Sequence, residues 1–476
     1  MSLIVLVSGN FNIIHPGHLR LLKFAKGCGT RLIVAVNSDR VAGNAGHVPE
    51  LFRLESVKLI SLVDNAFISD QSITETIAKL RPDIVVKGKE HEGRHNQELA
   101  ALGQYGGRLI FSSGETLFSS IDLIRKEFQS FDPRYISLPT EYLARHAIDR
   151  SRLVALLNDF AGLKICVVGD LIIDEYITCE PLGMSQEDPT IVVTPVDSTR
   201  FVGGAGIVAA HAAGLGAAVQ FVSVTGNDAS REYALEGLAA AGVVAQLLAD
   251  DIRPTTLKQR YRSKGKSLLR VSHLHQGAIS AALQTQLVAA IERRMDGADL
   301  LVFSDFNYGC LPQPLVDQLV AMAKGRGVLL AADSQSSSQV GDISRFKGMD
   351  LITPTEREAR ISTRNREDGL VVLAEQLRQQ ASAHNVLLKL GEEGLLIHAG
   401  NEKGDDWLTD RVDALNSAAK DVAGAGDSLL ITSAMTLACG GTIWEAACLG
   451  SLAAAVQVGR VGNTPLCTEE LLRELT

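Results

Sequence analysis

Residues 3–37 read LIVLVSGNFNIIHPGHLRLLKFAKGCGTRLIVAVN, and this pattern predicts a strand, a turn, a helix and a second strand. The apolar runs at residues 3–7 and 32–36 are short and rich in β-branched side chains, which is typical of buried strands. An amphipathic helix is expected between them, over about residues 16–28. Strand, helix and strand at this spacing form a βαβ unit, so we expect a parallel sheet. Similar runs add three strands, at residues 67–69, 83–86 and 108–112.

The α/β pattern starts again in the second part of the chain. A linker-like stretch, residues 129–139, precedes a predicted helix from Thr140, its expected N-cap, to Phe160. The strands expected after it lie at residues 164–168, 219–224, 300–304, 328–333, 350–353, 386–390 and 395–398.

The region between residues 175 and 272 departs from this pattern. Thr190–Pro195 and Thr256–Arg262 alternate in polarity as antiparallel strands do, which predicts a small inserted lid sheet. We therefore expect an α/β protein with two domains. The predicted division is a first domain at residues 1–135, a linker and helix at 136–160, and a larger domain at 161–476.

Composition argues against several classes of function. Lys and Arg total 46 and Asp and Glu total 55, so the net charge is −9, whereas nucleic-acid binding needs a basic excess. No apolar run approaches the roughly 20 residues of a membrane span, and the first residues lack the basic start of a signal peptide. Seven cysteines occur without a CxxC pair, which favours reduced thiols in a cytoplasmic protein. We expect neither nucleic acid nor a membrane among its partners.

The turn after the first strand holds His15, Pro16, Gly17 and His18, an HxGH pattern. Two imidazoles at a helix start can donate hydrogen bonds to the charge that develops on a transferring phosphate. Gly17 leaves room for the phosphate to approach. The pattern indicates nucleotidyl transfer, and the alternative is a helix start with two surface histidines. The HxGH pattern lies at the first β-to-α turn of an open sheet, and this position favours the nucleotidyl-transfer site over the alternative.

The first domain resembles the cytidylyltransferase-type nucleotidyltransferases, whose pattern is GxFDxxHxGH. GNFNIIHPGH matches this pattern, and RLIVAVNSD, Arg53, DIVVKG and FSSIDLIRK match motifs further along. The resemblance implies a Rossmann-like fold in which His15 and His18 stabilise the transferring phosphate. It also implies nucleotide contacts from Gly9, Phe11, Asn12, Lys87, Gly88, Ser119 and Ser120.

Two positions depart from that family. Asn12 stands where the family has an aspartate, and RVAGNAGHVP, residues 40–49, replaces a basic loop. Either change weakens nucleotide binding or alters the sugar phosphate that is accepted.

A second candidate site lies in DVAGAGDSLL, residues 421–430. The N–H groups of Gly424, Ala425 and Gly426 can form an anion hole at the start of the apolar helix that follows. Asp427 can take a proton from a hydroxyl while the hole holds the phosphoryl group, as phosphoryl transfer requires. The alternative is a glycine-rich loop in which Asp427 only favours the helix dipole.

Residues 164–476 resemble the ribokinase-like (PfkB) sugar kinases. The matching segments are VVGDLIIDEY, FVGGAGIVAAHAAGLGA, TPTERE, KLGEEGLLI and DVAGAGDS. The resemblance implies a three-layer α/β/α domain with a small β-sheet lid, using ATP (or another NTP) and Mg²⁺, with Asp427 as general base. It places Asp170, Asp174, Gly203 and Gly204 at the sugar, Lys389, Gly391 and Gly394 near the nucleotide, and Glu358 at magnesium and phosphate.

Both parts together resemble the bifunctional heptose kinases/nucleotidyltransferases of ADP-heptose synthesis, with the two modules in reverse order. Several polar residues of the kinase family are replaced, by Ile207, Tyr308, Thr355 and the segment ADSQS. Such changes at a polar pocket point to a different substrate, a related heptose or another phosphorylated sugar.

Three hypotheses follow: a bifunctional enzyme of sugar-nucleotide synthesis, a sugar kinase with a non-catalytic first domain, or a sensor of sugars or nucleotides without turnover. The expected ligands are a sugar phosphate and a nucleotide. We also expect a homodimer formed through the lid, because exposed sheet edges and apolar faces need covering. The segments expected at that interface are Thr190–Pro195 and Thr256–Arg262.

Overall fold

The computed structural model describes residues 3–14, 16–88, 96–111, 136–263, 266–336, 340–400 and 408–475. The chain divides into two compact units, Met1–Pro133 and Arg134–Thr476. None of the helices in these described ranges is long and apolar enough to cross a membrane.

The first unit is built on a parallel five-stranded sheet with the order β3-β2-β1-β4-β5. Its strands are β1 (Ile4–Gly9), β2 (Arg31–Asn37), β3 (Asn65–Ser69), β4 (Ile84–Lys87) and β5 (Arg108–Phe111), and its helices include α1 (Pro16–Gly27), α2 (Asp39–Ala42), α3 (Glu50–Lys58), α4 (Ile73–Leu80) and α5 (Glu98–Gly103). Side chains of β1 alternate between two buried clusters, with Val5 and Val7 on one face and Leu6 on the other. The strand order reverses between β1 and β4, and a ligand crevice forms at the carboxyl ends of strands at such a point.

The second unit contains a nine-stranded sheet with the order β10-β9-β6-β13-β14-β15-β16-β17-β18. The strands are β6 (Lys164–Gly169), β9 (Ala218–Thr225), β10 (Val244–Ala249), β13 (Leu300–Asp305), β14 (Leu329–Ser334), β15 (Leu351–Ile352), β16 (Asn385–Lys389), β17 (Leu395–Ala399) and β18 (Leu408–Val412). Those from β10 to β16 are parallel, and β17 and β18 are antiparallel to their neighbours.

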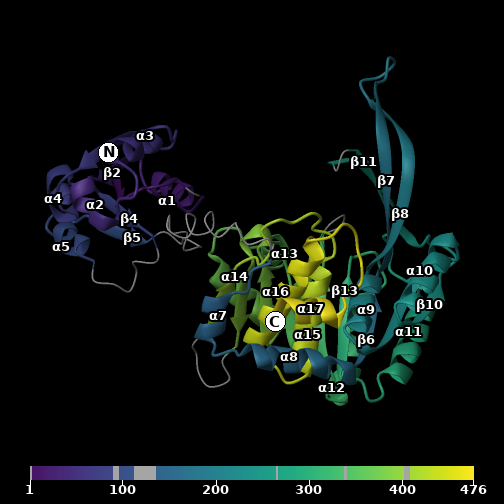
Figure 1. The fold of residues 1–476 in the computed structure, drawn as a ribbon. Helices are drawn as coiled ribbons and strands as arrows, with labels where there is room; N and C mark the ends of the chain where they lie inside the picture. Colours follow the sequence, from purple (N-terminus) through teal and green to yellow (C-terminus); the bar gives the residue numbers. More distant parts are fainter. Residues whose placement is uncertain are drawn as a thin grey trace. The chain divides into compact units, whose positions relative to one another are not determined.

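Helices cover both faces of this sheet, which confirms the predicted three-layer arrangement (Figure 1). One buried cluster joins the sheet to α8 (Arg150–Asp159), α9 (Ala205–Gly214), α10 (Ala229–Ala240), α15 (Ala425–Ala438), α16 (Ile443–Val458) and α17 (Thr468–Leu475). The other joins it to α11 (Ala281–Arg294), α12 (Gln313–Gly325), α13 (Glu356–Thr363) and α14 (Leu370–Ala381). Successive residues of β13 serve the two clusters in turn, as Leu300 and Leu301 do, because a strand points its side chains alternately to opposite faces.

The predicted helix from Thr140 to Phe160 is wrong as a single element. The chain forms α7 (Thr140–Arg145) and α8 instead, with Ala147 between them at φ +51°. Asp149 caps α8 by accepting the N–H of Ser151, whereas Thr140 lies inside α7 and caps nothing. Both helices pack into the core of the second unit, where the Tyr142 hydroxyl donates to the Trp444 carbonyl at 2.8 Å.

A separate four-stranded sheet forms the lid, with the order β12-β11-β7-β8. Its strands are β7 (Leu171–Met184), β8 (Ile191–Gly204), β11 (Thr256–Ser263) and β12 (Lys266–His273). The antiparallel pair β7 and β8 extends beyond the helices of the unit as a long ribbon (Figure 1). β11 lies inside the sheet, parallel to β7 and antiparallel to β12, while β8 forms an edge.

Candidate functional sites

The first candidate site lies where the sheet order of the first unit reverses. Gly9 is the last residue of β1 and Lys87 the last of β4, and Gly88 follows Lys87 at the same edge. Lys87 is held there by two contacts of its ammonium group, 2.8 Å from Glu98 Oε1 and 3.0 Å from Asn96 Oδ1. These residues therefore lie at the carboxyl edge of the sheet, where the strand order reverses.

Phe11 and His18 line the turn that leaves β1. Phe11 is 3% exposed, and a Cβ atom at Gly9 would lie 3.3 Å from its ring. The rings of Phe11 and His18 are 5.0 Å apart, and His18 Nδ1 lies 3.1 Å from the carbonyl oxygen of Ile13. Because a carbonyl only accepts, this contact places a proton on Nδ1 and orients the imidazole. His15, Ser119 and Ser120 lie outside the described residues.

Asn12 makes two hydrogen bonds to the segment that replaces the family's basic loop. Its Nδ2 donates to the Ala45 carbonyl at 2.8 Å, and its Oδ1 accepts the His47 N–H at 2.9 Å. An aspartate, the family residue, has no N–H to give to Ala45. Asn12 therefore makes a hydrogen bond to this loop that an aspartate could not make.

Asn12→Asp is expected to loosen this loop, since a carboxylate would face the Ala45 carbonyl in place of a donor. The loss of one hydrogen bond predicts that amide exchange over residues 43–48 accelerates by about tenfold. Hydrogen–deuterium exchange of the two forms measures this. An unchanged rate in the loop would show that Asn12 does not hold it.

Arg53 is fully buried and holds the turn after β1 and the loop that follows β2. Its guanidinium donates to the carbonyls of Asn10, Asn37 and Val48 and pairs with Asp39 at 2.6 Å. The ends of β1 and β2 are thus tied to the loop by one buried cation that makes four hydrogen bonds.

The second candidate site lies at the start of α15. Gly424 is its N-cap, with φ +75°, and Ala425, Gly426 and Asp427 form the first turn. The first N–H groups of a helix have no partners within it, so this turn can bind an anion. Gln335 Nε2 donates to Asp427 Oδ1 at 3.1 Å, which holds the carboxylate in place.

Asp427 is buried, and its surroundings suit a base. Burial, followed by the neighbouring charge of Asp333, raises the pKa of Asp427 to about 7. The charges of Asp174 and Lys258 also act on it. A carboxylate with a pKa near neutrality is suited to taking a proton in the transition state.

Lys389 lies beside the first turn of α15. It is the last residue of β16, and its Nζ lies 2.9 Å from Asp333 Oδ2. A Cβ atom at Gly426 would lie 3.1 Å from that Nζ, so glycine at this position makes room for the ammonium group. Burial alone would lower the pKa of Lys389, but the carboxylates of Asp333 and Glu358 outweigh it and raise that pKa. The next turn needs Gly391 and Gly394, at φ +64° and +95°.

Two carboxylates near Lys389 are candidates for magnesium. Both oxygens of Glu358 accept main-chain N–H groups, from Ser336 and from Thr355, each at 2.8 Å. Asp333 Oδ1 is buried without a hydrogen-bond partner in the described part of the chain. Within those ranges no cluster of three His, Cys, Asp or Glu side chains could hold a metal by itself. This set suits Mg²⁺, which keeps waters and phosphate oxygens and takes one or two carboxylates.

At the sugar end the structure separates two aspartates that the sequence pattern groups together. Both oxygens of Asp170 accept main-chain N–H groups, from Phe306, Tyr308 and Cys310 at 2.8–3.2 Å. Asp170 therefore organises that loop, and we do not include it in the sugar site. Asp174 is 6% exposed and its Oδ1 accepts no hydrogen bond from any described residue.

Gly203 and Gly204 adjoin these aspartates. A Cβ atom at Gly203 would lie 2.4 Å from Asp174 Oδ2, and one at Gly204 would lie 2.4 Å from the Asp170 carbonyl. Gly204 also has φ +58° and is the N-cap of α9. Glycine at both positions lets β8 pack closely against β7 and against the Asp170 carbonyl.

Two different family models match the two parts of the chain. The family model described as pfkB family carbohydrate kinase matches residues 163–470, and the model described as cytidylyltransferase-like matches residues 6–100. The chain belongs to the pfkB family of carbohydrate kinases.

Relatives of this pfkB kinase include proteins named bifunctional protein HldE. That of Nitrobacter hamburgensis is 32% identical over 329 residues, which are 67% of this chain and 65% of its own length. That of Desulfatibacillum aliphaticivorans is 31% identical over 320 residues, 66% of this chain and 64% of its own. The chain therefore spans 64–65% of the length of these curated relatives.

Solved structures show the ribokinase-like fold of the pfkB unit. The ribokinase of Arabidopsis thaliana, complexed with ribose and ATP, has a TM-score of 0.52 at 19% identity and covers 66% of this chain and 98% of its own. The ribokinase of Thermotoga maritima has a TM-score of 0.52 at 22% identity and covers 66% and 99%.

The lid of this pfkB kinase supplies cations that the sequence motifs did not reveal. Lys258, Arg260 and Arg262 alternate along β11 and therefore share one face. Lys258 Nζ lies 5.1 Å from the ring centres of Phe306 and of Tyr308, the residue that stands in place of a family lysine. Arg260 Nη2 lies 3.7 Å from Asp174 Oδ1. The alternation in KQRYR, residues 258–262, was the available signal.

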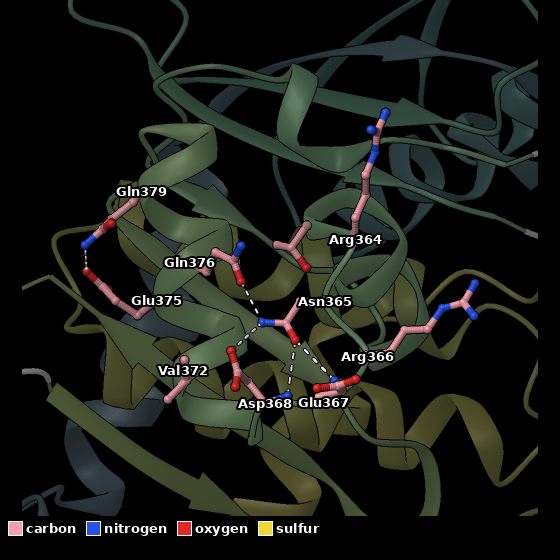
Figure 2. A pocket seen from close by; sticks show the side chains of 10 residues that line it. Arg364, Asn365, Arg366, Glu367, Asp368, Val372, Glu375, Gln376 and Gln379 are labelled. Atoms are coloured by element: carbon pink, nitrogen blue, oxygen red, sulfur yellow. Dashed lines mark hydrogen bonds between the residues drawn. The ribbon is translucent and has the colours of Figure 1, made fainter.

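Figure 2 shows a hollow at the C-terminal end of α13 in this pfkB kinase. Asn365 Nδ2 donates to Asp368 and Gln376, each at 2.7 Å, and so ties the loop to α14. The hollow is lined by Thr363, Arg364, Asn365, Arg366, Glu367, Asp368, Val372, Glu375, Gln376 and Gln379. None of these belongs to a candidate site, so we do not place a substrate there.

Proposed function

We propose that the protein is a bifunctional enzyme of sugar-nucleotide synthesis. Its second unit transfers a phosphoryl group from ATP to a heptose phosphate or related sugar, and its first unit transfers a nucleotidyl group from an NTP to a sugar 1-phosphate and releases pyrophosphate. The observation that carries the kinase proposal is the buried Asp427 carboxylate beside the anion hole and Lys389. The HldE relatives and the HxGH turn support the second activity.

In the kinase, Asp427 takes the proton of the sugar hydroxyl that attacks the γ-phosphorus. The N–H groups of Gly424, Ala425 and Gly426 hold the transferring phosphoryl group at the helix start. Lys389 adds a positive charge on the same side, since its Nζ lies directly over Gly426. Asp333 and Glu358 would hold magnesium, directly and through waters, and the ion would neutralise phosphate charge when bound.

The acceptor is proposed to be a phosphorylated sugar because the lid presents cations above Asp174. Arg260 stacks on Tyr176 with its guanidinium carbon 5.2 Å from the ring centre, and Lys258 lies over Phe306 and Tyr308. Both positions can pair with a phosphate while Asp174 accepts hydroxyls.

Arg260→Gln is expected to raise KM for the sugar phosphate by about tenfold or more, because a charged hydrogen bond is lost. The KM for ATP and the kcat are expected to stay near those of the parent. Steady-state kinetics with a heptose 7-phosphate and with the corresponding unphosphorylated heptose separate the effects. An equal rise in KM for both sugars would show that Arg260 does not contact the phosphate.

In the first unit, His18 is proposed to donate from its second ring nitrogen to the α-phosphate, because Nδ1 faces the Ile13 carbonyl. His15 is proposed to share that role, and Lys87 and Gly88 to line the nucleotide site at the end of β4. Ser119 and Ser120 are kept as proposed phosphate contacts. Asn12 holds the neighbouring loop in an ordered position, which supports an active site rather than a degenerate one.

The test is to supply ATP, a second NTP and heptose phosphates to the full chain and to measure ADP and pyrophosphate separately. Both products are expected, followed by a sugar nucleotide in the mass spectrum. ADP without pyrophosphate would leave a kinase with a non-catalytic first unit. Binding of both ligands without any product would favour a sensor and contradict the proposal.

We also propose a homodimer formed through the lid, in the cytoplasm. β8 is an edge strand, and its side chains Ile191, Val192 and Val196 are exposed. Thr190–Pro195 therefore stays in the proposed interface. Thr256–Arg262 lies in β11, between β12 and β7, so it has no free strand edge and is not proposed for the interface. The seven cysteines are all free, as expected in a reducing compartment.

A further inference from the structure

Asn463 lies between the sugar end and the anion hole of the kinase, in the segment that joins α16 to α17. Its side chain is 8% exposed, and its Nδ2 donates to Asp174 Oδ2 at 3.2 Å. A Cβ atom at Gly424 would lie 2.7 Å from Asn463 Oδ1, and one at Gly203 would lie 3.1 Å from Nδ2. One side chain thus adjoins both the sugar glycine and the first residue of the anion hole.

Two oxygen atoms here are buried without a hydrogen bond. Among the described residues, neither Asp174 Oδ1 nor Asn463 Oδ1 has a hydrogen-bond partner, although Arg260 lies 3.7 Å from the former. The amide cannot relieve this by turning over, because its oxygen would then face the carboxylate of Asp174. Leaving a buried acceptor unpaired costs about 1–3 kcal/mol. Such a pair of acceptors calls for a ligand that donates two hydrogen bonds.

We infer that Asn463 is a substrate-binding residue whose Oδ1 accepts a hydrogen bond from the sugar hydroxyl next to the one that is phosphorylated. This rests on the proposed kinase function. Gly424 begins the hole that receives the phosphoryl group, so an acceptor beside it lies near the reacting hydroxyl. Asp174 then takes a hydroxyl further along the ring. For phosphorylation at C1, the hydroxyl that Asn463 contacts is the one at C2.

The inference also accounts for a departure in the sequence. Ile207 stands where the kinase family has an asparagine, and it is 1% exposed within the apolar α9. Asn463, which donates to Asp174, offers an amide to the sugar end of the site from the segment after α16. A pocket that hydrogen-bonds a substrate hydroxyl rejects the analogue that lacks it.

The experiment measures kinase kcat/KM for a heptose 7-phosphate and for its single-deoxy analogues, with the parent chain, Asn463→Leu and Asn463→Ala. Thr464→Ala is the control, since Thr464 is the exposed neighbour. We expect both Asn463 variants to lose about tenfold in kcat/KM for the full sugar and little for the 2-deoxy sugar, with KM for ATP unchanged. The parent is expected to discriminate against the 2-deoxy sugar, and the variants to lose that discrimination.

An equal loss for every analogue would overturn the inference, because Asn463 would then act only by supporting Asp174. No loss in either variant would also overturn it, as would variants that fail to melt cooperatively in a thermal scan. In these cases the proposed kinase stands if the parent phosphorylates the heptose 7-phosphate. If the parent phosphorylates no sugar, both the function and the inference are wrong.

Discussion

Asp427→Asn is expected to lower kcat for sugar phosphorylation by about 10²–10⁴-fold while leaving pyrophosphate release unchanged. Asparagine keeps the size of the side chain and its contact with Gln335, but it cannot take a proton. Because the two proposed activities are assigned to separate units, the loss should be confined to ADP formation. Asp413→Asn is the matched control, since Asp413 is exposed on the same unit and outside the site.

The pH dependence of the parent checks the same assignment. The pKa of Asp427 is raised to about 7 by burial and by the charge of Asp333, so the carboxylate is protonated below that pH and ionised above it. The kcat/KM for phosphorylation is therefore expected to rise as the pH passes through about 7 and then to level off. If ADP formation in Asp427→Asn keeps the parent's rate and this same pH profile, another group is the base.

His18→Ala is expected to produce the second large effect, a loss of about 10²–10³-fold in pyrophosphate release. The imidazole is oriented by the Ile13 carbonyl and by the Phe11 ring, and alanine leaves the developing charge on the α-phosphate without that donor. ADP formation by the second unit serves as the internal control. An unchanged rate of pyrophosphate release would show that His18 takes no part, and the absence of pyrophosphate in the parent itself would show that the first unit is not catalytic.

The parts of the fold that depend on local patterns could be predicted from the sequence. The strand runs and the glycines before Asp427 each follow from neighbouring residues, and the structure forms these strands and places the glycines at the start of α15. The break between α7 and α8 could not be predicted from apolar periodicity, because it depends on Ala147 at φ +51° and on the Asp149 cap.

The site was harder to predict where its contacts join distant segments. Asp170 accepts N–H groups from a loop 136–140 residues away, and only that geometry distinguishes it from Asp174. Asn463 donates a hydrogen bond to Asp174, which lies 289 residues away in the sequence, so no local motif predicts this contact. The position of the β11 cations relative to Asp174 follows only from the strand register, in which Lys258 pairs with Asp174 and Arg260 with Tyr176.

The parallel pairing of β11 with β7 brings the cations of the lid beside Asp174. Asp174 and the cations Lys258 and Arg260 lie on adjoining strands of one sheet, whereas Lys389 ends β16 of the nine-stranded sheet and Asp427 lies in the first turn of α15, which packs against that sheet. Under the proposed function, selection of the sugar would depend on the four-stranded lid sheet, and transfer of the phosphoryl group on the nine-stranded sheet and α15. On that proposal, substitutions in the lid sheet are expected to change which sugar is accepted and to leave the residues that transfer the phosphoryl group unchanged.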